Sequence, residues 1–280
     1  MEIAAPLIAK KANAGNFILL RLDEKGERFP LTIADYDKQK GSIIVVFQVV
    51  GKSTKQLSNL NEGDDILDVI GPLGNKIHIE RYENPIIIIG GGVGIAPCYP
   101  QAKELKEAGN EIVAILGART RDLLFWKDKM KLVSDELIIC TDDGSEGIKG
   151  VVTDPLKELI KKRKVSLVIA IGPLIMMKYV ALTTNGKGEL PGVKTFVSLN
   201  TIMVDGTGMC GGCRVIVEEN GEKVIRFACV DGPDMDGHGI DFDILMKRNS
   251  RFVPQEKERM KRFENECKAL EKFESEKDIV

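Results

Sequence analysis

Three cysteines and one aspartate lie close together in the C-terminal third of the chain, at a spacing that suits a metal centre. The sequence reads Asp205-x4-Cys210-x2-Cys213-x15-Cys229, and these three cysteines are among six in the whole chain. Glycines occupy positions 206, 208, 211 and 212. Because glycine has no side chain to cover the backbone, such a stretch lets N-H groups approach an inorganic centre closely. A disulfide would need no such glycines.

With a cysteine in the first position, this pattern would match the C-x4-C-x2-C spacing, with a distant fourth cysteine, that holds a [2Fe-2S] cluster. We predict that Asp205, Cys210, Cys213 and Cys229 bind such a cluster. Glycine N-H groups would donate to the sulfur atoms and stabilise the negative charge of the cluster. Aspartate is a harder ligand than cysteine, so we expect it to shift the reduction potential and to loosen the cluster.

Three other interpretations of the cysteines stay open on the residues alone. A zinc ion could take the three cysteines with Asp205 or His238 as its fourth ligand. A redox-active Cys-x-x-Cys pair would need a helix N-terminus after a strand, whereas this pair is expected in a loop between strands. The cysteines could also be free thiols. Outside the cluster, Cys98, Cys140 and Cys267 occupy core-type positions and are predicted to be buried as small hydrophobic residues.

A second candidate site is the glycine-rich run Gly90–Pro97, with the sequence GGGVGIAP. It follows an apolar strand and opens a helix, which is the context in which backbone N-H groups bind phosphate. Gly117–Arg119 and Ile171–Met177 end later strands, and the carboxyl ends of parallel strands meet at one edge of a sheet. The sequence therefore predicts a dinucleotide site at this edge, where Arg119 either contacts a phosphate or ribose or is an ordinary surface arginine.

The elements that position these sites change in character along the chain. Residues 4–78 contain short β-rich runs without helical periodicity, which predicts a small antiparallel barrel. From residue 85 onward, apolar strands alternate with amphipathic helices, the pattern of a parallel sheet covered on both faces. Strand character returns at residues 193–206, and Glu-Asn-Gly at 219–221 predicts a hairpin. A charged helix is expected after residue 254, with a thin apolar stripe from Met260 to Leu270 that packs on its own protein or docks a partner.

We therefore predict an α/β plus all-β chain with four segments. Residues 1–82 form the antiparallel barrel, 83–195 an α/β nucleotide-binding domain, 196–245 a small iron-sulfur domain, and 246–280 a C-terminal helix. In the barrel, RFPLT (28–32) and VVGKSTKQL (49–57) place a cation or hydroxyls beside exposed backbone. Those groups suit the edge of a flavin ring and a pyrophosphate, although by composition alone both stretches read as ordinary strand ends.

Length and charge narrow the class of protein further. A chain of 280 residues with 43% apolar residues can form two or three domains with real cores. Lys and Arg number 40 against 42 acidic residues, and both are spread along the chain, so nucleic acid is not an expected partner. No signal peptide pattern or apolar segment of bilayer length is found. We expect a soluble cytoplasmic protein without a membrane partner.

The order of these motifs resembles the ferredoxin-NADP reductase superfamily: R-x-P-L-T and V-G-x-S-T-x-x-L in a barrel, then G-G-G-V-G-I-A-P, then G-P-x-x-M-M, then the cysteine-rich loop. Within it, the chain resembles electron-transfer subunits that add a two-iron cluster, such as that of dihydroorotate dehydrogenase B. Those subunits carry four cysteines and R-P-x-S, so Asp205 and RFPLT depart from them. Both departures, and the segment 229–243, are similar to the small (alpha) subunit of NADH-dependent reduced ferredoxin:NADP+ oxidoreductases, also described as the beta subunit of archaeal sulfide dehydrogenase.

The resemblance implies which residues bind the cofactors. FAD would lie in the barrel, with its isoalloxazine ring along Arg28, Pro30, Leu31 and Thr32 and its pyrophosphate near Val50, Gly51, Ser53 and Thr54. NAD(H) or NADP(H) would lie across the glycine-rich run toward the flavin, and its candidate contacts are Gly91, Gly92, Val93, Gly94, Ile95, Ala96, Pro97, Arg119, Gly172, Pro173 and Met176. Many members carry a cysteine where this chain has Ile171, so hydride transfer would depend on placement alone.

The resemblance also implies a function. NAD(P)H would give a hydride to FAD, and the [2Fe-2S] cluster would pass single electrons to a separate large flavo-iron-sulfur subunit in a heterodimer. Ferredoxin would react through that complex, which would be of the electron-bifurcating transhydrogenase type. Two alternatives are an electron-transfer subunit of dihydroorotate dehydrogenase B, which would use the same cofactors, and a zinc-stabilised nucleotide-binding module without catalytic activity.

Overall fold

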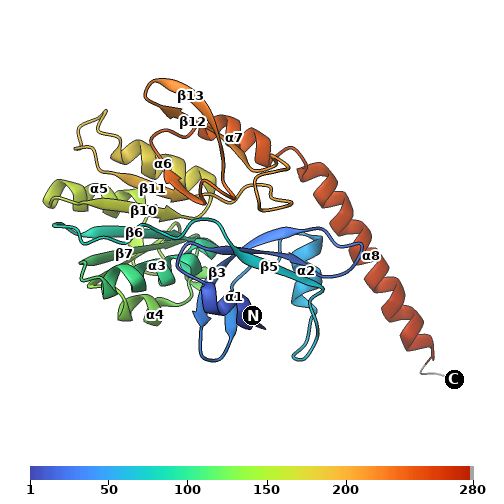
Figure 1. Ribbon diagram of the computed structural model, residues 1–280. Coiled ribbons are helices and arrows are strands. Elements are labelled where there is room, and N and C mark those ends of the chain that lie inside the picture. Colours follow the sequence, from blue (N-terminus) through green and yellow to red (C-terminus); the bar gives the residue numbers. More distant parts are fainter. Residues whose placement is uncertain (278–280) are drawn as a thin grey trace.

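The computed structural model describes the backbone of residues 1–277 and the side chains of residues 1–265. The N-terminal part is a curled antiparallel sheet in the order β1-β4-β3-β2-β5 (Figure 1). Its core contains Ile18, Leu20, Ile33 and Ile43, which are fully buried. The strands are β1 (Glu2–Ala4), β2 (Phe17–Arg21), β3 (Phe29–Asp37), β4 (Ser42–Val45) and β5 (Asp68–Leu73). The predicted antiparallel β domain is therefore confirmed, in the form of a half-barrel.

Two short helices interrupt this β domain, and the sequence pattern did not predict them. Helix α1 (Pro6–Lys11) begins at a proline, which is favoured in the first turn because its missing N-H costs nothing there. Helix α2 (Lys52–Ser58) occupies most of the VVGKSTKQL stretch, which reads by composition as a strand end. Its start is fixed by Thr54, whose Oγ1 accepts from Gly51 N at 3.1 Å.

The middle of the chain builds a seven-stranded sheet in the order β14-β11-β10-β6-β7-β8-β9. Neighbours from β11 to β9 are parallel, and β14 pairs antiparallel with β11. Because side chains alternate along a strand, Ile86 and Ile88 face one core, while Ile87 and Ile89 face the other. The strands are β6 (Ile86–Gly91), β7 (Ile112–Ala118), β8 (Glu136–Thr141), β9 (Ile148–Lys149), β10 (Leu167–Ile171), β11 (Thr195–Ser198) and β14 (Asp234–Asp236).

Helices cover both faces of this sheet, as predicted, since α3 and α4 pack on one face and α5 and α6 on the other. The apolar spacing of residues 122–133 predicts one continuous helix, but only part of this segment is helical. A 3-10 turn over Arg121–Leu123 is followed by α4, and Trp126 between them adopts a left-handed backbone with φ of 54°. The helical elements are η1 (Gly92–Gly94), α3 (Ile95–Glu107), η2 (Arg121–Leu123), α4 (Lys127–Leu132), α5 (Thr153–Lys162) and α6 (Leu174–Thr184).

The cysteine-rich segment is attached to the seven-stranded sheet at both ends, by β11 before it and β14 after it. Between them lies the predicted hairpin of β12 (Arg214–Glu219) and β13 (Glu222–Phe227). Its turn residues Asn220 and Gly221 both have positive φ, at 54° and 83°, as a two-residue hairpin turn requires. The cysteine-rich segment therefore begins and ends in the seven-stranded sheet, through β11 and β14.

Two helices end the described chain, α7 (Phe242–Asn249) and the long α8 (Val253–Lys277). In Figure 1, α8 runs away from the body past α2. Met260 and Phe263 of the predicted stripe are half-buried, whereas Cys267 and Leu270 lie outside the described side chains. Among residues 1–277, no helix is both long and apolar enough to span a membrane.

Candidate functional site

The four predicted metal ligands lie in two pairs. In the first pair, Oδ2 of Asp205 accepts a hydrogen bond from Cys210 N at 2.5 Å. In the second, the Sγ atoms of Cys213 and Cys229 are 3.2 Å apart. That separation is too long for a disulfide, which needs about 2.05 Å, and it allows two thiolates to share one metal ion. Cys213 and Cys229 are buried, whereas Cys210 is exposed at the surface of the loop.

Glycines give this loop its shape. Gly206, Gly208 and Gly211 all have positive φ, at 71°, 85° and 64°, which other residues rarely adopt. Gly212 N donates to the Sγ of Cys210 at 3.4 Å, so one of the predicted N-H to sulfur contacts is present.

Protonation of the ligands follows from their surroundings. The N-H groups of Thr207 and Cys210 lower the pKa of Asp205 below its ordinary value, against a smaller opposing effect of burial. The carboxylate is therefore ionised at neutral pH. Burial first, and then the contact with Cys213, raise the pKa of Cys229. A metal bound there must displace the thiol proton, so we expect metal binding to release protons.

This donor set fits a centre with two metal ions. Each iron of a two-iron cluster needs two ligands from the protein, and the chain supplies two pairs. Asp205 accepts one hydrogen bond on each oxygen, but a carboxylate has about four acceptor positions, so positions remain for a metal. His238, the other candidate fourth ligand for zinc, lies 3.0 Å from the Oγ1 of Thr184 on α6. In the described part of the chain, no three His, Cys, Asp or Glu side chains converge on a position for one ion.

The cysteine loop packs directly on the N-terminal sheet. A Cβ on Gly206 would lie 2.6 Å from a methyl carbon of Leu73 and 3.0 Å from one of Leu19, and the residue has a φ of 71°, so glycine is favoured against β2 and β5 there. On the other side of the cysteines, Asn75 donates from its backbone N to Gly232 O at 2.7 Å and from Nδ2 to Val230 O at 2.9 Å. Strand β3, with the predicted flavin contacts, is the neighbour of β2.

The two stretches predicted to bind FAD also lie next to each other. Ser53 Oγ donates to the Oε2 of Glu27 at 3.3 Å, which brings α2 beside the start of RFPLT. Nη2 of Arg28 lies 3.9 Å from Oδ2 of Asp68, whereas Nε of Arg21 lies only 2.5 Å from the same oxygen. The guanidinium of Arg28 therefore keeps most of its donors free for an anion.

Of the predicted pyrophosphate contacts near α2, Thr54 is hydrogen-bonded within the protein, whereas the backbone of Gly51 is open to a ligand. Thr54 Oγ1 accepts from the N-H groups of Val50 and Gly51, at 3.1 Å each, so its hydroxyl is part of the loop. A Cβ on Gly51 would meet no atom within 4 Å. The backbone at Gly51 is therefore accessible to a ligand.

The glycine-rich run meets the end of β10, as predicted for one sheet edge. A Cβ on Gly94 would lie 2.2 Å from Ile171 O, and one on Gly91 would lie 2.3 Å from the Sδ of Met176. Gly94 is needed for close packing because its neighbours are backbone atoms, whereas at Gly91 the side chain of Met176 would have to move. Gly92 differs, because it has a φ of 54° and its missing Cβ would face open space. The backbone at Gly92 is where a nucleotide phosphate could approach most closely.

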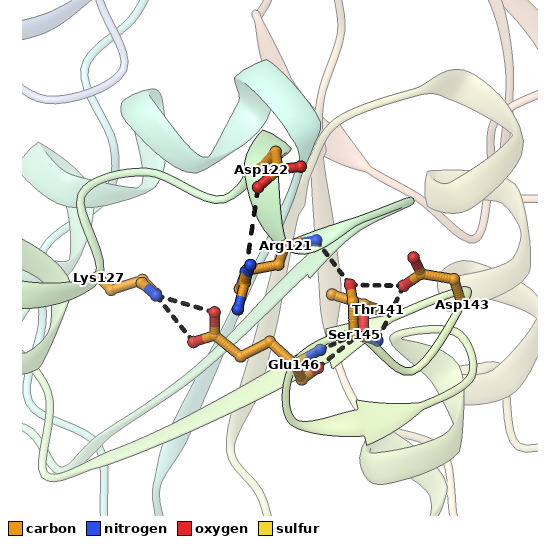
Figure 2. Close-up of polar contacts among 7 residues, drawn as sticks. All are labelled: Arg121, Asp122, Lys127, Thr141, Asp143, Ser145 and Glu146. Carbon is orange, nitrogen blue, oxygen red and sulfur yellow. Dashed lines mark hydrogen bonds and ion pairs between the residues drawn. The ribbon is translucent and has the colours of Figure 1, made fainter.

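Farther along the same edge, a polar network that no sequence pattern predicted joins the loops after β7 and β8 (Figure 2). Arg121 N donates to Ser145 Oγ at 2.8 Å, and Ser145 Oγ donates to Asp143 at 2.6 Å. Lys127 pairs with Glu146 at 2.8 Å. The available signal was the short polar run Thr-Asp-Asp-Gly-Ser-Glu at 141–146 after β8. Arg119 itself is exposed, so its side chain can reach a ligand bound at this edge.

Comparisons with known proteins agree with this division of sites. Residues 200–241 match the family model for the iron-sulfur cluster binding domain of dihydroorotate dehydrogenase B, and residues 88–181 match the oxidoreductase NAD-binding domain. The first of these matches contains all four predicted metal ligands, and the second contains the glycine-rich run.

Whole-chain relatives extend the match to the N-terminal sheet. The chain is 52% identical to the "dihydroorotate dehydrogenase B (NAD(+)), electron transfer subunit homolog" of Thermotoga maritima, over 93% of this chain and 89% of that protein. It is 33% identical to the corresponding electron transfer subunit of Desulforamulus reducens, over 83% of this chain and 88% of that protein. Among solved structures, a chain of the NADH-dependent reduced ferredoxin-NADP oxidoreductase is 51% identical, with a TM-score of 0.85 and coverage of 94% and 91%.

Proposed function

Since the chain belongs to the family of dihydroorotate dehydrogenase B electron-transfer subunits and their homologues, we propose that it transfers electrons between NAD(P)H and a larger flavo-iron-sulfur subunit in a ferredoxin:NAD(P) oxidoreductase. The chain is an oxidoreductase subunit with an NAD-binding domain and an iron-sulfur cluster-binding domain on a flavin-binding type of fold. We further propose that the flavin is FAD, that the cluster contains two irons, that the partner is a large flavo-iron-sulfur subunit, and that the complex bifurcates electrons.

One observation carries the proposal: the cysteine loop rests directly on the sheet predicted to bind the flavin. A Cβ on Gly206 would meet Leu19 on β2 and Leu73 on β5, and β2 lies one strand spacing, about 4.8 Å, from β3, which carries RFPLT. Electron transfer weakens steeply with distance. A cluster and a flavin bound at these positions would therefore be close enough to exchange electrons without a further carrier.

The chain's own residues bind and orient the cofactors. When bound, FAD exchanges a hydride with the nicotinamide and single electrons with the cluster, and that chemistry belongs to the cofactors. Arg28 supplies a positive charge at the edge of the flavin site, and the open backbone at Gly92 admits a phosphate. Asp205 and the three cysteines would hold the irons, and Gly212 N donates to the sulfur of Cys210.

The predicted ligand set favours one of the two enzyme types in this family. Identity alone does not separate them, because the chain is 51% identical to the chain in the ferredoxin-NADP oxidoreductase structure and 52% identical to the T. maritima homolog of the dihydroorotate dehydrogenase subunit. Asp205 in the first ligand position supports the ferredoxin-NADP oxidoreductase type, because the dihydroorotate dehydrogenase subunits are expected to carry a cysteine there. The second candidate function is therefore the dihydroorotate dehydrogenase subunit, which differs in its partner.

Anaerobic purification and cofactor analysis test the proposal. We expect an absorption band near 450 nm from flavin with broad iron-sulfur bands, FAD on extraction, and reduction of ferricyanide by NADH or NADPH. Purification from the native host through an affinity tag, followed by mass spectrometry, identifies the partner. A colourless protein that contains zinc and no iron or sulfide would reject the proposal, and a dihydroorotate dehydrogenase catalytic subunit as partner would select the second candidate.

Replacing Asp205 with cysteine should keep the cluster and change its reduction potential, because a soft thiolate would take the place of a hard carboxylate. The measurement is a redox titration followed by electron paramagnetic resonance. Thr207→Cys is the control, because it adds an exposed thiol to the same loop outside the ligand positions. Equal potentials in Asp205→Cys and the wild-type chain would show that Asp205 is not a ligand.

Replacing Arg28 with alanine should weaken FAD retention at least tenfold, since a charge-assisted hydrogen bond contributes about 1.5 to 3 kcal/mol. The measurement is FAD occupancy after gel filtration, with iron content as the internal reference. Arg163→Ala is a matched control, because Arg163 is also partly exposed and pairs with Glu111 and Glu136 at the far end of the parallel sheet. Full FAD occupancy in Arg28→Ala would contradict the assigned position of the flavin.

A further inference from the structure

A groove of about 440 Å³ lies between the β12–β13 hairpin and α7, outside the predicted cofactor sites. Four cations line it, two from α7, one from the start of β12 and one just after α7: Lys247, Arg248, Arg214 and Arg251. Figure 1 shows α7 beside β12 and β13. In a chain with a formal net charge of -2, this is a local concentration of positive charge.

Within the described residues, none of these four cations forms a salt bridge. Acidic residues nearby are engaged elsewhere, since Glu219 pairs with Arg226 at 2.5 Å and Asp241 with Lys223 at 3.3 Å. Burial, and then the charges of Arg214 and Arg251, lower the pKa of Arg248. The groove therefore has positive charge that an external anion would stabilise.

The floor of the groove is apolar. Ile216, Ile225 and Ile244 line it together with the cations, and Ile225 on the outer face of the hairpin is 57% exposed. A small inorganic anion would gain nothing from three isoleucines, because it has no apolar surface to bury. A polypeptide segment that carries both acidic and apolar side chains would satisfy both parts of the groove.

The groove is joined to the cysteine loop. Arg248 Nη2 donates to Gly212 O at 3.3 Å, and a Cβ on Gly211 would lie 3.7 Å from the side chain of Arg214. At the tip of the loop, Met209 is 85% exposed next to the exposed ligand Cys210. Any protein seated in the groove would thus also cover the loop that holds the cluster.

We propose that this groove, defined by Arg214, Lys247, Arg248, Arg251 and the three isoleucines, is the docking site for an acidic, partly apolar segment of the large electron-transfer partner. The inference rests on the proposed function, because it assumes that electrons leave through the cluster to another protein. Complementary charge would orient the partner and accelerate its association. The hydrogen bond from Arg248 to Gly212 O would connect the docked segment to the cluster loop.

Zero-length crosslinking of the native complex tests contact directly. A carbodiimide joins a lysine amine only to a carboxylate that touches it, so Lys247 is the probe in the complex isolated from its host. We expect a peptide that links Lys247 to an aspartate or glutamate of the large subunit. Lys157 and Lys162, exposed on α5, are the control lysines. Crosslinks to the partner from these control lysines, with none from Lys247, would overturn the proposal.

Charge reversal gives the second test. The double variant Lys247→Glu with Arg251→Glu should bind the purified large subunit at least tenfold more weakly at low salt, and the difference should shrink as salt screens the charges. The milder pair Lys247→Gln with Arg251→Gln should give a smaller loss. Lys157→Glu with Lys162→Glu, an equal change of charge elsewhere, should bind like the wild-type chain.

Two further readouts separate this proposal from the proposed function. Iron content and ferricyanide reduction by NAD(P)H should be unchanged in the groove variants, because these residues lie outside the predicted flavin and nucleotide sites. If the wild-type chain lacks iron and this activity, the proposed function fails. If the wild-type chain has both but the reversed groove binds the large subunit with unchanged affinity, the docking site is rejected and the proposed function stands.

Discussion

The variant Cys213→Ser is expected to lose the cluster, with its iron content falling from roughly two atoms per chain to near zero. Cys213 is buried beside Cys229, with their Sγ atoms 3.2 Å apart. A serine hydroxyl stays protonated at neutral pH and is a poor iron ligand, so one iron would keep a single protein ligand. Iron, acid-labile sulfide and the visible spectrum of anaerobically purified protein are the measurements.

The same variant should keep the flavin and the first half of the reaction. The RFPLT stretch and the glycine-rich run lie outside the cysteine loop, so ferricyanide reduction by NAD(P)H should continue while transfer to the large subunit stops. Cys140→Ser is the matched control, since Cys140 is also a buried free thiol but lies on β8, near the opposite end of the sheet from β14. Normal iron and sulfide in Cys213→Ser would disprove the assigned ligand set.

Sequence patterns predicted the parts of the fold in which local signals agree with tertiary structure. The run of isoleucines at 86–89 is apolar at every position because both faces of the sheet are covered, and all four side chains are fully buried. The hairpin was predictable because Asn220 and Gly221 suit the positive φ of its turn. The predicted metal ligands came from spacing together with the family resemblance, and residues 200–241 match an iron-sulfur cluster binding domain.

The features that sequence patterns missed depend on contacts between distant residues. The short strand β14 is recognisable only by its pairing with β11, because a run of Asp-Met-Asp has no strand signal. Helix α2 is too short for helical periodicity and depends on one threonine cap. The groove beside α7 combines cations that are 37 residues apart in the sequence, Arg214 and Arg251.

At the glycine-rich run, Gly94→Ala is expected to destabilise the chain by about 3 kcal/mol and to lower nucleotide affinity at least tenfold. The backbone of Gly94 is helical, with φ of -61°, so alanine is acceptable there in conformation. Its Cβ, however, would lie 2.2 Å from Ile171 O and 2.8 Å from the Cα of Gly172. Both are backbone atoms at the end of a central strand, and neither can rotate away as a side chain would.

To relieve this contact, η1 must move away from β10. The same displacement should therefore lower both the free energy of unfolding and the affinity for the nucleotide. Gly92 is the glycine of η1 whose missing Cβ would face open space. Its backbone would shift together with η1, and the predicted phosphate contact would shift with it. Gly188→Ala is the control, because a Cβ there meets no atom within 4 Å, and its free energy of unfolding should change by less than about 0.5 kcal/mol. Denaturant unfolding and NADH titration measure the two effects. Wild-type values of both for Gly94→Ala would mean that η1 and the end of β10 do not meet as closely as the structure places them.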